Sequence, residues 1–495
     1  MSDPCDLSAT EARRLIGEKT LSPVELVESC IARVEAVDPA INAIPERDFE
    51  RALATARRHE DAVVAGEPLG VLHGLPVGVK DMVDVAGLKT TYGSLAFRDN
   101  VAATDEGLVA DLRLEGAIVL GKTNVPEWSA GGNSRNAVYG TTGNPFDPAK
   151  SAAGSSGGSA AALATGMVPL ATGSDTGGSL RNPASFCGVV GFRPTPGLVP
   201  AEKRGMAWLQ LSTLGPMGRT VEDTALLLSA MAGPDARDPL SLIAHGAEGY
   251  APERFRALEP MDLSTLKVAV SPDFGFAPTE AAIAETFRAK LDRFRVVFAA
   301  ADDAHPDCTG ADEAFELLRA VAFLGPHRTM LAETPELVGD NVRANVEEGL
   351  TYSAADIARG FELQTALYRH WQDFYRDYDF VLTPSVTMRP RAWTELYPAE
   401  LDGRPTRTYY HWLAMAYAPT LAGHPAVSLP VGRDADGMPF GLQIVGPRGG
   451  DLAVLRMAAT LERYLAADAK TARPVPDIAA LTAAPPIAGM PGFHP

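Results

Sequence analysis

The stretch "SAAGSSGGSAAALATGMVPLATGSDTGGSLRNPASFCG", Ser151–Gly188, contains two clusters of glycine and serine, each joined to an apolar segment. The small residues after Gly158 predict a short helix, and "MVPLATGSD" predicts a buried strand that ends in glycine and serine. A flexible linker would continue in glycine and serine, whereas these clusters border elements of defined period. We therefore interpret the clusters as structured turns that hold functional groups.

Two kinds of chemistry use such turns. Glycine-rich turns before a helix bind phosphate through backbone N–H groups, but "GSSGGSAA" lacks the lysine and the spacing of a phosphate-binding loop. In "DTGGS", Gly177 and Gly178 leave N–H groups uncovered next to Ser179, as an oxyanion hole requires. The residues favour nucleophilic catalysis by Ser179 over phosphate binding.

A serine nucleophile needs a base that takes its proton. The nine histidines lie in no motif typical of a serine triad. Lys80 ends the apolar run "GLPVGVK", where burial would disfavour the charged amine and lower its pKa. Lys80 is therefore the candidate base, and a buried ion pair with Asp81 or Asp84 is the structural alternative.

The rest of the chain continues the alternation of strands and helices. Buried strands are predicted over Val71–Val79 and Ala117–Asn124, and "FVLTPSV", "AVSLPVG" and "FGLQIVG" return to strand character near the C-terminus. The capping-box patterns "SATE" at Ser8 and "SPVE" at Ser22 each predict the start of a helix. This alternation predicts an α/β fold whose late strands join the first sheet.

The pattern also divides the chain along its length. We predict one domain over residues 1–470, with a helical N-terminal layer over about residues 1–60 and a helical insertion over about residues 225–375. The insertion is the more charged part of the chain. Residues 471–495 are rich in proline and are predicted to form an extended tail.

Composition excludes several classes of protein. The 46% apolar and 21% charged residues are typical of a globular protein, and neither a disordered nor a membrane protein has this balance. The net charge of −18 disfavours binding to nucleic acid and to anionic membranes. The N-terminus lacks a secretory signal pattern, so we expect a cytoplasmic protein. The four cysteines are widely spaced and are expected to be free thiols that bind no metal.

The motifs together resemble those of the amidase signature enzymes, a family of serine hydrolases. Beyond the opening stretch, "GLPVGVKDMVDVAGLKTTYGS", "GKTNVPEWSAGGNSRNAVYGTTGNPFDP" and "LAGHPAVSLPVGRDADGMPFGLQIVGP" are similar to segments of that family in the same order. The similarity covers most of Leu7–Glu462 and is weak over the middle of the chain and in the tail. It implies the fold of the family, a central mixed twisted β-sheet flanked by helices on both faces.

The resemblance also implies roles for individual residues. Ser179 would be the nucleophile, Ser155 the bridging serine after a cis peptide bond, and Lys80 the terminal base. The oxyanion would be held by the N–H groups of Thr176, Gly177, Gly178 and Ser179. Hydrogen bonds that fix these groups would come from Ser156, Ser174, Asp175 and Arg181, whose alternative role is capping of turns and strand ends. Substrate contacts are expected from Trp128, Gly131, Gly132, Met206 and Trp208, with core packing as the alternative for the larger side chains.

The activity implied is hydrolysis of amide-type C–N bonds through an acyl-enzyme, with no metal and no cofactor. Aryl and alkyl amides, carbamates (urethanes) and esters all fit this chemistry, so the partner would be a small-molecule amide or carbamate, bound by a monomer or homodimer. One alternative is the glutaminase subunit of a tRNA-dependent amidotransferase, but "DNVRANVEEGLTYSAADIARG" lacks the "RRxxLG"-like segment of those subunits. The other is a noncatalytic binding protein, which the presence of Lys80, Ser155 and Ser179 together disfavours.

Overall fold

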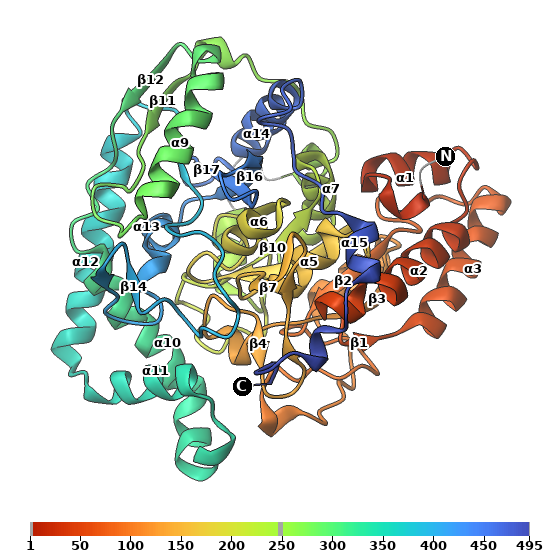
Figure 1. Ribbon diagram of the computed structural model, residues 1–495, viewed down its shortest axis with the longest axis horizontal. Coiled ribbons are helices and arrows are strands. Elements are labelled where there is room, and N and C mark those ends of the chain that lie inside the picture. The colour runs from red at the N-terminus through yellow and green to blue at the C-terminus, as the bar shows by residue number, and fades with distance from the viewer. Residues whose placement is uncertain (1–2, 246–250, 495) are drawn as a thin grey trace.

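A mixed β-sheet of 11 strands forms the centre of the computed structural model, which describes residues 3–245 and 251–494 (Figure 1). Across the sheet the strands are β1 (Glu46–Arg47), β3 (Ile118–Thr123), β2 (Pro76–Lys80), β8 (Leu170–Asp175), β10 (Thr213–Gly218), β9 (Val190–Arg193), β16 (Ala426–Arg433), β17 (Pro439–Val445), β13 (Phe380–Pro384), β11 (Lys267–Val270) and β12 (Ala300–Asp303). β2 runs parallel to both β3 and β8, and β11 runs parallel to β12 and β13, whereas the other pairs are antiparallel. The predicted mixed sheet is confirmed, and the late strands join it as expected.

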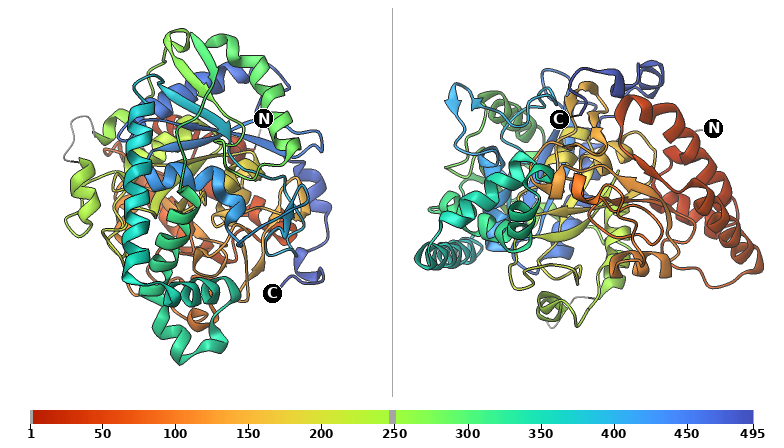
Figure 2. Two further views of the ribbon diagram at one scale, coloured as in Figure 1. Left: turned by 90° about the vertical axis from the view of Figure 1, so that its left-hand side faces the viewer. Right: turned by 90° about the horizontal axis from the view of Figure 1, so that it is seen from below.

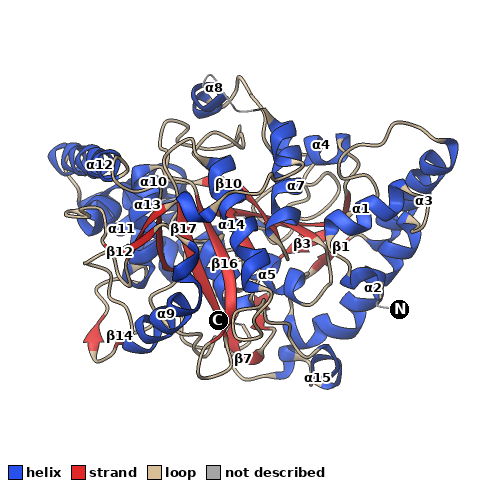
Figure 3. Ribbon diagram, turned by 90° about the horizontal axis from the view of Figure 1, so that it is seen from above, coloured by secondary structure: helices blue, strands red, loops and turns tan. Residues whose placement is uncertain are grey.

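Helices cover both faces of the sheet (Figure 3). They are α1 (Ala9–Gly17), α2 (Pro23–Ile41), α3 (Phe49–Ala65), α4 (Gly107–Leu114), α5 (Gly157–Ala164), α6 (Arg181–Cys187), α7 (Val221–Met231), α8 (Pro239–His245), α9 (Ala281–Phe294), α10 (Ala311–Glu333), α11 (Asp340–Thr351), α12 (Ala354–Phe374), α13 (Ala414–Ala422), α14 (Asp451–Leu465) and α15 (Ile478–Ala483). The N-terminal helices α1 to α3 and the helices α10 to α12 lie at opposite ends of the molecule (Figure 2). Three short hairpins pair β4 (Arg135–Asn136) with β5 (Gly140–Thr141), β6 (Gly143–Asn144) with β7 (Asp147–Ser151), and β14 (Glu400–Leu401) with β15 (Arg404–Pro405).

Helix α5 is built from glycine, serine, alanine and leucine, and all of its residues are buried. A Cβ atom on Gly158 would lie 2.3 Å from the backbone nitrogen of Asn124, just after β3. Only glycine allows so close an approach. The small residues of the opening stretch therefore let α5 pack directly against the sheet and bring the serine before it close to the strand ends.

The N-terminal layer begins its helices largely as the capping patterns predict. Ser22 accepts hydrogen bonds from the N–H groups of Val24 and Glu25, and the Glu25 carboxylate accepts from the Ser22 N–H, which completes the capping box of α2. At α1, Ser8 accepts from the Glu11 N–H, but the Glu11 carboxylate pairs with Arg14 instead of closing a box. Both helices start at the predicted residues, and only the second cap is reciprocal.

The middle of the chain is less uniformly helical than predicted. It contributes β11 and β12 to one end of the sheet, ahead of the long helices α10 to α12. The sequence "KVAV" of β11 is short, and only its apolar residues hint at a strand. Pairing with β13 supplies the partner that makes so short a strand stable.

The proline-rich tail is extended over much of its length but also contains α15. Leu481 and Ile487 are buried, so this segment packs onto the domain instead of projecting from it. All four cysteines are buried free thiols, as predicted. Across residues 3–245 and 251–494, no helix has both the length and the apolar character needed to cross a bilayer.

The cap of α2 gives a first test of the fold. Ser22→Ala removes an acceptor for two N–H groups and a hydrogen bond of 2.5 Å to Glu60, so the free energy of unfolding should fall by about 1 kcal/mol. Urea unfolding followed by circular dichroism measures the change. Ser22→Thr keeps the hydroxyl and should lose less, and equal losses for the two variants would contradict the role of the cap.

Candidate functional site

The site lies where two neighbouring parallel strands end. Lys80 is the last residue of β2, and Asp175 is the last residue of β8, which is paired with β2. The carboxyl ends of adjacent parallel strands meet at one edge of a sheet, where α/β folds place their ligands. Ser155 comes just before α5, and Ser179 comes just before α6. The two glycine and serine clusters therefore converge on the same edge.

Lys80 is buried among serine hydroxyls. Its Nζ lies 2.6 Å from Ser155 Oγ, 2.9 Å from Ser156 Oγ and 2.9 Å from Ser174 Oγ. Burial lowers the pKa of Lys80 to about 7, and the charge of Asp175 opposes this shift only in part. At neutral pH a large fraction of this amine is therefore uncharged.

The hydroxyls around Lys80 suit the neutral amine. A charged lysine donates three hydrogen bonds, whereas a neutral amine donates two and offers one lone pair. Two donated bonds to Ser156 and Ser174 leave the lone pair for the hydroxyl of Ser155, which makes the shortest contact. The arrangement can therefore withdraw the proton of Ser155.

Among the described residues, Lys80 forms no ion pair, which was its alternative role. Asp81 is buried and pairs with Lys122 at 3.0 Å between Nζ and Oδ1. Asp84 pairs with Lys203. Both carboxylates that could have neutralised Lys80 are thus occupied by other lysines.

The loops that carry Ser155 and Ser179 touch through their backbones. The Ser156 N–H donates to the carbonyl oxygen of Ser179 at 3.2 Å, and the peptide bond between Gly154 and Ser155 is cis, as predicted. Ser155 is buried, whereas Ser179 is partly exposed. Within the described residues, the Ser179 hydroxyl makes no hydrogen bond, which leaves it available to a ligand.

The four N–H groups predicted to form an oxyanion hole differ in whether they already have a hydrogen-bond acceptor. The Gly178 N–H donates to Asp175 Oδ1 at 2.8 Å, so it is already satisfied. The N–H groups of Thr176, Gly177 and Ser179 have no acceptor in the described part of the chain. These three are the donors that an oxyanion could use.

Asp175 is held between two buried arginines. Its carboxylate accepts from Arg181 Nε at 3.0 Å and Nη2 at 2.9 Å, and Arg193 Nη1 lies 3.3 Å from Oδ1. Burial raises the pKa of Asp175, but Arg181, Arg193 and the Gly178 N–H outweigh it and keep this pKa well below its usual range. The ionised carboxylate ties the turn after β8 to the start of α6.

Several residues of this network were not predicted as site residues. Arg193 is the last residue of β9, which lies beyond the opening stretch and was not among the predicted strands. Arg181 also donates to Gln443 Oε1 at 2.6 Å and to Thr420 Oγ1 at 2.9 Å. These two residues are more than 200 positions away, and no local pattern marks them.

The residues proposed to contact substrate occupy different surroundings. Trp128 stacks on Tyr92, with ring centroids 4.3 Å apart, and also faces His327 of α10 at 4.7 Å. A Cβ atom on Gly132 would lie 2.2 Å from a ring carbon of Trp412, and one on Gly131 would lie 2.8 Å from Asn341 Nδ2. Both glycines are buried and lie next to Gly154, so they adjoin the cis peptide before Ser155.

Met206 and Trp208 lie in the loop between β9 and β10, and these residues are 37% and 76% exposed. Such exposure excludes the alternative of core packing for Trp208. Met206 Sδ lies 3.1 Å from the position of a Cβ atom on Gly325, which places this loop against α10. Contact of either side chain with a substrate stays a prediction.

Phe315 and Ala416, which lie beside the oxyanion loop, were not predicted from the sequence. A Cβ atom on Gly177 would lie 2.9 Å from the ring of Phe315 in α10, and one on Gly178 would lie 2.5 Å from Ala416 Cβ in α13. Phe315 stacks on Tyr417 with centroids 4.3 Å apart. Helices α10 and α13 thus form a wall of the site, and α10 comes from the middle of the chain, where the family resemblance is weak.

Known proteins are similar to this chain in sequence and in fold. The family model described as Amidase matches residues 25–455. An acylamidase of Rhodococcus erythropolis is 36% identical over 459 residues, covering 92% of this chain and 95% of that protein. A glutamyl-tRNA(Gln) amidotransferase subunit of Picosynechococcus sp. is 33% identical over 464 residues, covering 86% of this chain and 92% of that protein.

Solved structures agree with the sequence relatives. A bacterial aryl acylamidase of the amidase signature enzymes has a TM-score of 0.85 and 28% identity, covering 98% of this chain and 99% of that chain. A 6-aminohexanoate cyclic dimer hydrolase complexed with substrate has a TM-score of 0.82 and 27% identity, covering 96% of this chain and 100% of that chain. The likeness spans both chains almost completely.

The Asp175 network gives a test of the site's framework. Asp175→Asn leaves two buried guanidinium groups without a full negative partner, so the free energy of unfolding should fall by about 3–5 kcal/mol. Urea unfolding of the purified variant measures the loss. The control is Asp99→Asn, which breaks an exposed pair with Lys89 of 3.2 Å and should cost less than about 1 kcal/mol. Similar losses for the two variants would show that the buried network is not a stabilising element.

Proposed function

The chain belongs to the amidase family, and we propose that it is a serine hydrolase that cleaves amide-type C–N bonds through an acyl-enzyme on Ser179. One observation carries this proposal: the buried amine of Lys80 contacts the hydroxyl of Ser155 at 2.6 Å, beside the loop that bears Ser179. A neutral amine at this position is a base that needs no histidine. Lys80, Ser155 and Ser179 are thus the proposed catalytic residues.

In the first step Ser179 Oγ attacks the scissile carbonyl carbon. The proton of Ser179 passes to Ser155 Oγ as the proton of Ser155 passes to Lys80 Nζ. The carbonyl electron pair moves to oxygen, and the free N–H groups of Thr176, Gly177 and Ser179 stabilise the resulting oxyanion. One such donor is typically worth about 3 kcal/mol in the transition state.

In the second step the proton returns through Ser155 to the leaving nitrogen, and the C–N bond breaks. The amine departs and leaves an ester on Ser179. Water then attacks this ester, giving its proton through Ser155 to Lys80, and the acid is released as Ser179 regains its proton. Every proton transfer in this cycle uses a group of the chain itself.

The substrates we propose are aryl and alkyl amides, with carbamates and esters as further candidates. Support comes from the relatives described as acylamidase and aryl acylamidase, and from the aromatic residues Phe315 and Trp412 beside the site glycines. An alcohol leaves more easily than an amine, so esters should be cleaved as a side activity. A small molecule bound by a monomer or homodimer is sufficient for this chemistry.

The glutaminase alternative is favoured by the amidotransferase subunits found among the relatives. The segment weighed for this alternative, residues 340–360, contains two arginines: Arg343 donates to the carbonyl oxygens of Pro335 and Val338, and Arg359 pairs with Glu313 at 3.3 Å. Arg343 is therefore engaged in holding its own loop. We favour the amidase, and glutamine is included in the test.

The proposal is tested by product release from 4-nitroacetanilide, a primary amide, glutamine and an aryl carbamate. Wild type should release amine or ammonia, and Ser179→Ala should reduce the rate by at least about a thousandfold, because it removes the nucleophile. The control is Ser264→Ala. Ser264 is exposed and is not a residue of the site, so this variant should behave as wild type.

Labelling with a serine-reactive phosphonate, read by mass spectrometry, should modify Ser179 in wild type. Activity of Ser179→Ala equal to wild type, or a phosphonate bound elsewhere, would refute the assignment. Turnover of glutamine in preference to the other amides would favour the glutaminase.

The pKa of Lys80 sets the expected pH dependence. Only the neutral amine accepts a proton, so kcat/KM for an uncharged amide should be half-maximal near pH 7 and should fall about tenfold from its plateau by pH 6. Initial rates between pH 5.5 and pH 9 measure the profile. Lys80→Met should lose most of the rate together with its pH-dependent arm, and a wild-type profile flat across this range would argue against Lys80 as the base.

A further inference from the structure

Arg319, a buried arginine near the site, lacks an acidic partner within residues 3–245 and 251–494. Arg319 lies in α10 and is only 3% exposed, yet it makes no ion pair with any described residue. Its Nε donates to the Tyr409 hydroxyl at 3.1 Å, and its Nη2 donates to the same oxygen. Its Nη1 has no hydrogen-bond partner in the described part of the chain. This nitrogen is not fully buried, so a ligand can reach it.

Aromatic rings surround this guanidinium group. Its central carbon lies 4.9 Å from the ring centroid of Phe323, 5.1 Å from Tyr409, 5.2 Å from Tyr410 and 5.7 Å from Phe315. Cation–π attraction offsets part of the cost of burying the charge. It does not replace an anion, because the N–H groups of arginine are directed in the plane of the guanidinium and need acceptors there.

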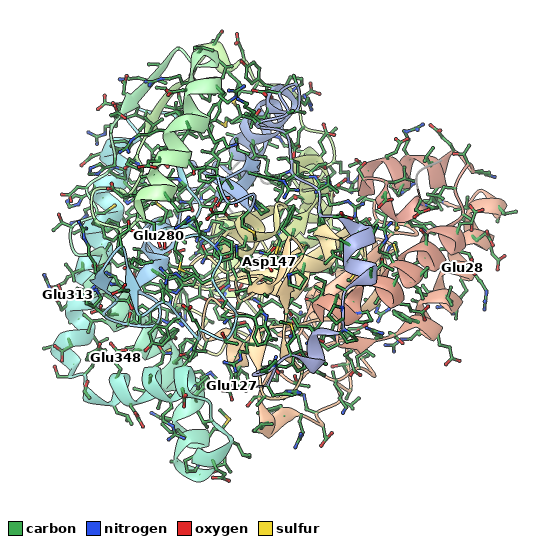
Figure 4. The ribbon with its side chains drawn as sticks, in the orientation of Figure 1. Glu28, Glu127, Asp147, Glu280, Glu313 and Glu348 are labelled. Carbon is green, nitrogen blue, oxygen red and sulfur yellow. The ribbon has the colours of Figure 1, made fainter. Side chains whose placement is uncertain are left out.

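Two acids of the neighbouring helical region, Glu316 of α10 and Glu348 of α11, have other partners. Glu316 pairs with Arg407 at 3.0 Å. Glu348, which comes from α11 (Figure 4), accepts from the Tyr352 hydroxyl at 2.7 Å and from the Tyr410 hydroxyl at 3.4 Å. Neither carboxylate lies within ion-pair distance of Arg319. The positive charge is therefore left for a group from outside the chain.

Arg319 also borders the site on two sides. Phe315 lies one helical turn before it and contacts Gly177 of the oxyanion loop. Tyr409, which binds Arg319, is linked to Trp412 because the Trp412 Nε1 donates to the Tyr409 carbonyl oxygen at 3.1 Å. Trp412 in turn contacts Gly132, next to the peptide before Ser155. One aromatic residue thus separates Arg319 from the Gly177 loop, and two separate it from the Gly132 loop.

We propose that Arg319 binds a carboxylate carried by the substrate, several bonds away from the scissile carbonyl. The inference rests on the proposed amidase function and deepens it: the preferred substrates would be amides that also bear a carboxylate, such as half-amides of dicarboxylic acids. Nη1 supplies the free donor, and Nη2 keeps the guanidinium in place through Tyr409. The low polarity of the surrounding aromatic rings strengthens the ion pair with such a ligand.

Matched pairs of substrates test this proposal and locate the carboxylate. For the acyl side, glutaryl 4-nitroanilide is compared with pentanoyl 4-nitroanilide, which has the same chain length and leaving group but no charge. For the amine side, pentanoyl 4-carboxyanilide is compared with pentanoyl 4-carbamoylanilide. Wild type should prefer the charged member of one pair by tenfold or more in kcat/KM, mainly through KM.

Arg319→Met should abolish this preference, and Arg319→Lys should retain part of it, because lysine keeps the charge but not the planar donors. The control is Arg328→Met, an exposed arginine of the same helix, which should keep the wild-type ratio. The ratio within each pair cancels a general loss of folded enzyme. No preference in either pair, or a preference kept by Arg319→Met, would overturn the proposal.

Binding to an inactive enzyme separates this inference from the proposed mechanism. Calorimetry with Ser179→Ala should show tighter binding of the charged member of the selective pair, and Ser179→Ala combined with Arg319→Met should bind both members equally. If Ser179→Ala still hydrolyses the anilides, the acyl-enzyme proposal fails while the carboxylate subsite can still be measured. Equal binding of the two members to Ser179→Ala would refute the subsite alone.

Discussion

The burial of one amine, that of Lys80, is the constraint on which the rest of the site depends. A second buried lysine, Lys122, lies in the neighbouring strand and is neutralised by Asp81 at 3.0 Å. Because Asp81 is taken, Lys80 is surrounded by hydroxyls and not by a carboxylate. Two neighbouring strands therefore end with one lysine held in an ion pair and another that can lose its proton near neutral pH.

Close packing of backbones brings the remaining groups to that amine. Gly158 allows α5 to approach β3, Gly177 and Gly178 fit under α10 and α13, and Gly132 fits under Trp412. A side chain at any of these positions would collide with a neighbour at less than 3 Å. The high glycine content of the opening stretch is thus explained by distance between elements as well as by uncovered N–H groups.

Local patterns in the sequence predicted much of the secondary structure around the candidate site. The strand ending at Lys80, the helix after Ser155 and the strand before Ser179 follow from apolar period and small residues, and the candidate catalytic groups follow from their motifs. Distant partners leave no such pattern: Gln443 and Thr420 meet Arg181 only because β17 and α13 fold back onto α6. Phe315 and Arg319 were also missed, since their helix looks from its pattern like any amphipathic helix.

The middle segment that supplies α10 to α12 starts from β11 and β12, which are hydrogen-bonded into one end of the central sheet. The wall of the site is therefore anchored through strand register to the same sheet that holds Lys80, several strands away. A hydrogen-bonded sheet is rigid, so the two halves of the site keep fixed positions relative to each other. Exchanging this wall between relatives would require moving the two strands together with the helices.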